Sequence, residues 1–68
     1  MAEPKLGVRL KEARTEAGLT QAELAERVGV SRKTVNTVEN GVFIPSTLLA
    51  LKLAQALKMK VEDLFYVE

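Results

Sequence analysis

The sequence predicts an all-α fold, a compact bundle of five short helices. Two observations lead to this fold class. Apolar residues recur along the chain at the three-to-four-residue spacing of amphipathic helices, and no segment reads as part of a sheet. Ser, Thr, Gly and Pro stand between these segments, where they begin or end helices. A chain of 68 residues has room for one small domain, so we expect a single domain over residues 1–68.

The first two helices are predicted from apolar spacing and capping residues. One helical face is shared by Leu6, Leu10 and Ala13. A first helix is therefore expected over about residues 5–17, ended by Gly18. Thr20 and Glu23 then form a capping-box pattern, which places a short second helix at about 20–28.

The remaining helices have equally clear boundaries. Ser31 is expected to cap a third helix that runs to about residue 40 and is closed by Gly41. A fourth helix opens at Pro45–Ser46 and continues to about Leu57. The segment "VEDLF" predicts a fifth turn or short helix. Lys58, which follows the fourth helix where glycine would be the easier residue, is expected to adopt a left-handed conformation.

Composition excludes several classes of function. The chain contains no cysteine and no histidine, so it has no disulfide, no zinc site of the usual kind and no histidine-based catalysis. No cofactor, metal or small-molecule ligand is expected. No apolar run is long enough to span a membrane and the first residues are unlike a signal peptide, so we expect a cytoplasmic protein. The net charge is only +1, so a signal for nucleic acid must come from where the charges lie.

The second and third helices have the layout of a helix-turn-helix motif at about residues 21–40. The close crossing of two helices requires a small side chain, which Ala25 supplies, and the turn requires positive φ, which Gly29 adopts without strain. The positions expected to face inward are all apolar: Leu24, Val28, Val30, Val35 and Val38.

The exposed face of the third helix carries an unusual set of residues. Helical spacing places on it Arg32, Lys33, Asn36, Thr37 and Asn40. An ordinary solvated face is the alternative interpretation. However, cations at a helix N-terminus oppose the macrodipole, and the Thr and Val residues here are mediocre helix formers. DNA explains both features, because Arg and Lys can donate to guanine, Asn can pair with adenine, and a Thr methyl can contact thymine.

The segments "LTQAELAERVGVS" and "VENG" resemble the Xre/Cro–C1 family of helix-turn-helix regulators, and the resemblance extends over about residues 6–65. It implies a lambda-repressor-like five-helix bundle that binds operator DNA as a two-fold dimer. It also implies DNA-binding roles for Gln21, Ser31, Arg32, Lys33, Asn36, Thr37 and Asn40. Of these, Gln21 corresponds to a phosphate contact that braces the third helix, and Arg32, Lys33 and Thr37 correspond to base-reading positions.

Two further features bear on structure and assembly. By the same resemblance, Arg14 and Glu39 are expected to form a partly buried ion pair, the alternative being two exposed charges.

The chain has more apolar residues than so small a core can cover. The following residues are therefore predicted to form a homodimer interface: Phe43, Ile44, Leu48, Leu51, Phe65, Tyr66 and Val67. The alternative is that they complete the domain's own core. The tail at 65–68 could form a strand if a partner chain paired with it.

The function predicted from the sequence is therefore sequence-specific binding of double-stranded DNA by a small regulator, as a dimeric repressor of a palindromic operator. An enzyme is not expected, because the acids Glu62 and Asp63 are explained by their place in the first turn of a helix. Two alternatives stay open. One is an antitoxin or controller protein that acts mainly on a protein partner, and the other is the DNA-binding module of a longer regulator.

Overall fold

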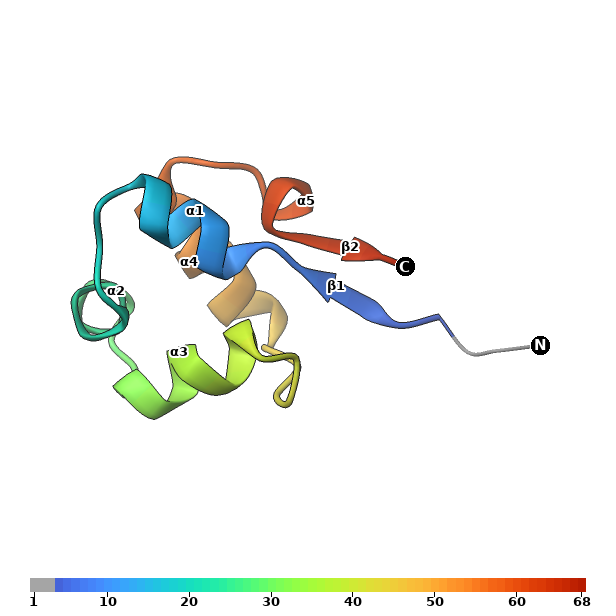
Figure 1. The fold of residues 1–68 in the computed structure, drawn as a ribbon, viewed down its shortest axis with the longest axis horizontal. Coiled ribbons are helices and arrows are strands. Elements are labelled where there is room, and N and C mark those ends of the chain that lie inside the picture. The colour runs from blue at the N-terminus through green and yellow to red at the C-terminus, as the bar shows by residue number, and fades with distance from the viewer. Residues whose placement is uncertain (1–3) are drawn as a thin grey trace.

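A computed structural model describes residues 4–68 as five α-helices and a two-stranded sheet (Figure 1). In chain order the elements are β1 Leu6–Val8, α1 Leu10–Glu16, α2 Gln21–Val28, α3 Arg32–Glu39, α4 Thr47–Leu57, α5 Val61–Leu64 and β2 Phe65–Val67. The five-helix prediction is confirmed. No helix in the part of the chain that the structure describes is long and apolar enough to cross a membrane.

Side-chain caps fix where three of the helices begin. Thr20 Oγ1 accepts a hydrogen bond from Glu23 N at 3.0 Å, and Thr20 N donates to Glu23 Oε1 at 2.9 Å, which completes the capping box of α2. The Thr20 backbone N–H, followed by its hydroxyl, lowers the pKa of the Glu23 carboxyl. Ser31 and Ser46 cap α3 and α4 by accepting from the backbone N–H three residues on, at 3.2 and 3.1 Å.

Left-handed residues follow four of the helices, and the glycines expected to end α1 and α3, Gly18 and Gly41, have φ 75° and 72°. Gly29 ends α2 with φ 76°, as the turn of a helix-turn-helix motif requires. Lys58 ends α4 with φ 57° and ψ 42°, so the left-handed conformation expected there is confirmed. It is the one non-glycine residue with positive φ among residues 4–68, and the conformation costs roughly 1 kcal/mol relative to glycine.

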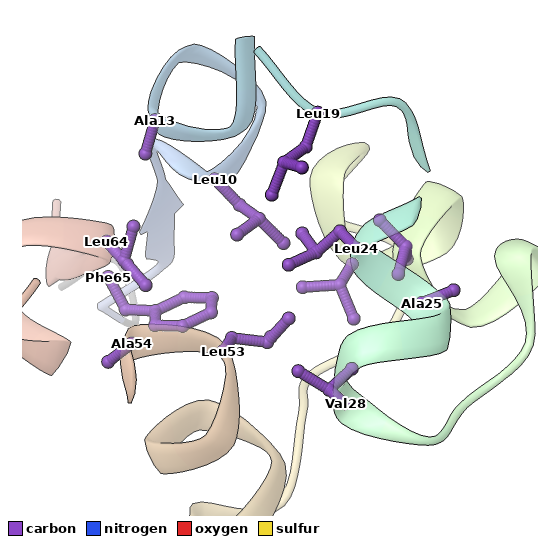
Figure 2. Close-up of a cluster of buried hydrophobic side chains, with 12 residues drawn as sticks. Leu10, Ala13, Leu19, Leu24, Ala25, Val28, Leu53, Ala54, Leu64 and Phe65 are labelled. Carbon is purple, nitrogen blue, oxygen red and sulfur yellow. The ribbon is translucent and has the colours of Figure 1, made fainter. Parts of the chain in front are cut away.

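All five helices contribute buried side chains to the core, part of which is shown in Figure 2. Leu10, Leu24 and Leu53 come from three different helices and point toward one another, with the ring of Phe65 beside them. The buried residues are Leu10, Ala13, Leu19, Leu24, Ala25, Val28, Val35, Val38, Leu53, Ala54, Leu64 and Phe65. They include Val35 and Val38 of α3, so that helix is anchored on its inner face.

The sheet was not predicted, and the expectation that the first helix starts near residue 5 is wrong. Helix α1 begins at Leu10, and the preceding residues form β1, which lies antiparallel to β2 at the other end of the chain (Figure 1). The paired residues are Leu6 with Val67, Gly7 with Tyr66 and Val8 with Phe65. Backbone hydrogen bonds of 2.8 Å extend the pairing, from Arg9 N to Leu64 O and from Glu68 N to Lys5 O. Leu6 therefore belongs to a strand and not to the face of a helix.

The C-terminal tail pairs with the N-terminal segment of the same chain. The pairing of β2 with β1 within one chain replaces the predicted pairing with a partner chain. Phe65 is buried in the domain's core, so it is not one of the exposed apolar residues. Tyr66 is half-buried: the Arg9 guanidinium lies 4.5 Å from the centre of its ring, and the ring occupies space that a Cβ atom on Gly7 would fill. Only Val67 in β2 is exposed.

Candidate nucleic-acid interface

The turn between α2 and α3 holds the two helices in a fixed relation. Ala25 is buried where they pack together, and its carbonyl oxygen accepts a hydrogen bond from Val30 N at 3.0 Å, across the turn. The other residues expected to face inward are also covered. Leu24, Val28, Val35 and Val38 are buried, and Val30 is half-buried against the core. With one side of α3 packed in this way, its opposite side must face solvent.

Glu39 links α3 to the two preceding helices. Its carboxylate accepts from Arg14 Nε at 2.6 Å, from Arg14 Nη2 at 3.3 Å and from Gln21 Nε2 at 3.0 Å. Arg14 also donates from Nη1 to the carbonyl oxygen of Leu19 at 2.7 Å. The carboxylate side chain is only 2% exposed, so these donors replace its water. The structure thus places Arg14 and Glu39 in an ion pair, and Gln21 braces α3 through the same carboxylate.

A cationic surface lies at the N-terminal end of α3. One shallow hollow is lined by Gln21, Arg32, Lys33 and Asn36. Arg32 and Lys33 are exposed, and neither forms an ion pair within residues 4–68. Two free cations therefore lie beside a glutamine and an asparagine amide, as an interface with DNA bases and phosphates requires.

The hydroxyls and amides further along α3 bond mainly to one another or to the backbone. Thr37 Oγ1 lies 3.0 Å from the carbonyl oxygens of both Lys33 and Thr34, so its proton is engaged within the helix. Thr37 therefore presents its methyl group more readily than a hydroxyl donor. Asn40 Nδ2 donates to Asn36 Oδ1 at 3.2 Å, which leaves three of the four amide protons of this pair for an external partner.

Sequence reasoning missed a second hollow on the same helix. Its lining consists of Ser31, Lys33, Thr34, Thr37 and Phe43. The loop after Gly41 turns back so that Val42 N and Phe43 N both approach the carbonyl oxygen of Thr37, at 3.0 and 3.2 Å. Phe43 was predicted to belong to a dimer surface, but this loop places it beside α3. In the sequence, the apolar segment "VFI" indicates that these side chains contact something. It does not indicate whether Phe43 lies beside α3 or beside α4.

The other predicted interface residues lie along α4 and the sheet. An apolar groove is lined by Leu6, Ile44, Pro45, Thr47, Ala50, Leu51, Val61 and Phe65. Ile44 is 72% exposed, Leu48 64% and Leu51 54%, which is unusual for side chains of this size and polarity. Of the predicted interface residues, Ile44, Leu51 and Phe65 therefore line this groove, and Phe43 lies beside α3.

Comparison with known proteins decides the family. The family model described as helix-turn-helix matches residues 10–64, which is α1 to the end of α5. This chain belongs to the Xre/Cro–C1 type of helix-turn-helix regulators. The family consists of transcriptional regulators with a DNA-binding fold, not of enzymes.

Similar proteins named as HTH-type transcriptional regulators occur in bacteria and archaea. The chain is 48% identical over 60 residues to the HTH-type transcriptional regulator YgzD of Bacillus subtilis, covering 88% of this chain and 91% of the relative. It is also 48% identical over 60 residues to an HTH-type transcriptional regulator of Methanothermobacter thermautotrophicus, covering 87% of each. Among solved structures, the restriction-modification controller protein C.AhdI of Aeromonas hydrophila superposes with a TM-score of 0.77, at 42% identity, over 81% of this chain and 83% of that one.

Proposed function

We propose that this Xre/Cro–C1 protein is a cytoplasmic transcriptional repressor that binds a palindromic operator as a homodimer. The observation that carries this proposal is the position of Arg32 and Lys33. Both are exposed and unpaired within residues 4–68, at the end of a helix whose other side is anchored by Val35 and Val38. A rigid helix that presents free cations at its N-terminal end has the geometry used to read the major groove.

The chemistry follows from the side chains that α3 presents. Arg32 and Lys33 donate to the O6 and N7 atoms of guanine, and the Asn36 amide pairs with adenine. Gln21 keeps one amide proton for a phosphate while the other holds Glu39. Ser31 and Asn40, at the two ends of α3, are assigned to the DNA backbone. The phosphates also offset the unfavourable interaction between the two cations and the helix dipole.

The homodimer is assigned to the groove along α4. The exposed apolar residues Leu6, Ile44 and Leu51 line it. Two more exposed apolar residues are Leu48, on α4, and Val67, the strand partner of Leu6. A two-fold contact between identical patches would cover these side chains, which one 68-residue chain leaves in water. The same two-fold axis would present two copies of α3 to successive major grooves, which explains why the operator should be an inverted repeat.

A restriction-modification controller is the second candidate. The similarity to C.AhdI, at 42% identity over most of both chains, favours it specifically. A controller would bind DNA through the same side chains as a general repressor, and the two would differ in the genes that they regulate. Mapping the selected operator onto the source genome separates the two: a site beside restriction and modification genes favours a controller, and a site elsewhere favours a general repressor.

Selection from a random duplex library at near-physiological salt tests the proposal. The parent should enrich an inverted repeat with half-sites about one helical turn apart, and the double variant Arg32→Ala/Lys33→Ala should not. Enrichment of a single half-site would argue against the dimer while leaving base reading intact. If folded parent protein enriches no sequence, the proposed function is wrong, and a protein partner becomes the better explanation.

A further inference from the structure

The exposure of Phe43 is not explained by the proposed function. Phe43 is 47% exposed, and it belongs to the loop that directly follows the helix to which we assign base reading. Phe43 does not line the groove along α4, so a dimer contact at that groove does not explain why the residue is exposed. It lines the hollow on α3 instead, together with Lys33 and Thr37.

Backbone hydrogen bonds hold the loop that carries Phe43 against α3. Gly41 turns the chain with φ 72°, and Val42 N and Phe43 N then converge on the carbonyl oxygen of Thr37. These contacts, of 3.0 and 3.2 Å, tie the loop to the last turn of the helix. A loop tied at this point moves with α3, so α3 would carry Phe43 with it to the DNA.

Several polar groups around the hollow bond within the protein. Ser31 Oγ and Thr34 Oγ1 lie 3.0 Å apart, and Ser31 Oγ also accepts from Thr34 N. The Thr37 hydroxyl proton is engaged by backbone carbonyls. The groups that remain available are the Lys33 ammonium group, the Phe43 ring, the methyl groups of Thr34 and Thr37, and one hydroxyl proton of the Ser31–Thr34 pair. This combination suits a small apolar group that lies next to hydrogen-bond acceptors.

The major groove contains one group of that kind, the 5-methyl group of thymine, which lies next to base-edge acceptors. We propose that Phe43, together with the Thr37 methyl group, forms an apolar wall that selects a thymine methyl beside the base contacted by Lys33. This inference rests on the proposed function, because it requires α3 to lie in the major groove. It assigns a role in sequence specificity to a loop whose side chains cannot donate to phosphate.

The test replaces thymine by deoxyuridine, which lacks only the methyl group. Each thymine of the duplex selected by the parent is replaced in turn, and affinities are measured by fluorescence anisotropy. Removing a buried methyl group should weaken binding by the parent about fourfold at one position in each half-site. In Phe43→Ala the thymine and deoxyuridine duplexes should bind equally at that position. Thr37→Ser, which keeps the hydroxyl and removes the methyl group, should reduce the preference as well.

Val42→Ala is the matched control, because Val42 is in the same loop, is 77% exposed and does not line the hollow. It should keep the parent's preference for thymine. The inference is overturned if the parent binds both duplexes equally at every position, or if Phe43→Ala keeps the preference. It is also overturned if Phe43→Ala weakens both duplexes equally, since the ring would then contact the DNA backbone or a second copy of the chain. Failure of the parent to select any duplex would instead refute the proposed function.

Discussion

Arg14 on α1 and Glu39 on α3 form an ion pair in which Arg14 Nε lies 2.6 Å from Glu39 Oε2. The same carboxylate accepts from Gln21 at the start of α2, so one buried group joins three helices. Glu39 is the last residue of α3, the helix to which we assign base reading. The pair therefore connects the stability of the fold to the orientation of the surface that meets DNA.

Breaking this pair from one side should destabilise the domain strongly. Arg14→Ala leaves the Glu39 carboxylate buried without its main partner, which is expected to lower the free energy of unfolding by about 3–5 kcal/mol. Urea denaturation followed by circular dichroism measures the change. The control is Arg14→Met/Glu39→Leu, which removes both charges and should recover much of the loss. Equal losses in the single and double variants would show that packing, and not the unpaired charge, sets the cost.

The capping box of α2 should make stability depend on acid pH. The pKa of Glu23 is lowered in the folded state, so its contribution is present above the unfolded pKa and is lost as pH falls through the folded value. The parent should therefore lose thermal stability relative to Glu23→Gln as pH drops below the usual carboxyl range, near 4.5. Melting temperatures of both proteins between neutral pH and about pH 3 provide the test. A constant difference across this range would mean that the carboxylate charge is unimportant.

The groove along α4 should control oligomeric state. Leu51→Glu places a charge among apolar side chains at the proposed two-fold contact, so it should convert a dimer into a monomer. Leu51 is 54% exposed in the single chain, so the substitution leaves the core intact. Sedimentation equilibrium of the two proteins reports the change. Gln55→Glu, a substitution on the same helix outside this groove, is the control and should leave the dimer unchanged. A parent that is monomeric at the concentrations where it binds an inverted repeat would contradict this interface.

Local signals predicted the helices well. Thr20, Ser31 and Ser46 are side-chain caps in the structure, and Gly29 and Lys58 adopt the left-handed conformations expected of them. These features depend on residues within about one helical turn, which a sequence displays directly. The inward positions of α2 and α3 were predictable for the same reason, because helical periodicity fixes which residues share a face.

Contacts between distant residues were not predictable in this way. β1 pairs with a segment far along the chain, so that Gly7 lies opposite Tyr66. The three residues of β1 are too few to show the alternating pattern that predicts a strand. Phe65 looked like a tail residue and is part of the core, because the pairing of β2 with β1 brings it inside. The position of Phe43 beside α3 was not predictable either, because the loop's direction depends on backbone hydrogen bonds to Thr37.

The most direct measurement of the central claim compares affinity for the selected operator with affinity for a scrambled duplex at one fixed salt concentration. Arg32→Ala and Lys33→Ala are each measured against a control that removes two exposed cations outside the hollows on α3, Lys11→Ala/Lys52→Ala. If α3 reads bases, each single variant should lower the ratio of specific to non-specific affinity about 5- to 150-fold, which corresponds to about 1–3 kcal/mol. The control should weaken both duplexes to a similar extent and keep the ratio. An unchanged ratio in Arg32→Ala and Lys33→Ala would contradict the assignment of α3 as the helix that reads the operator.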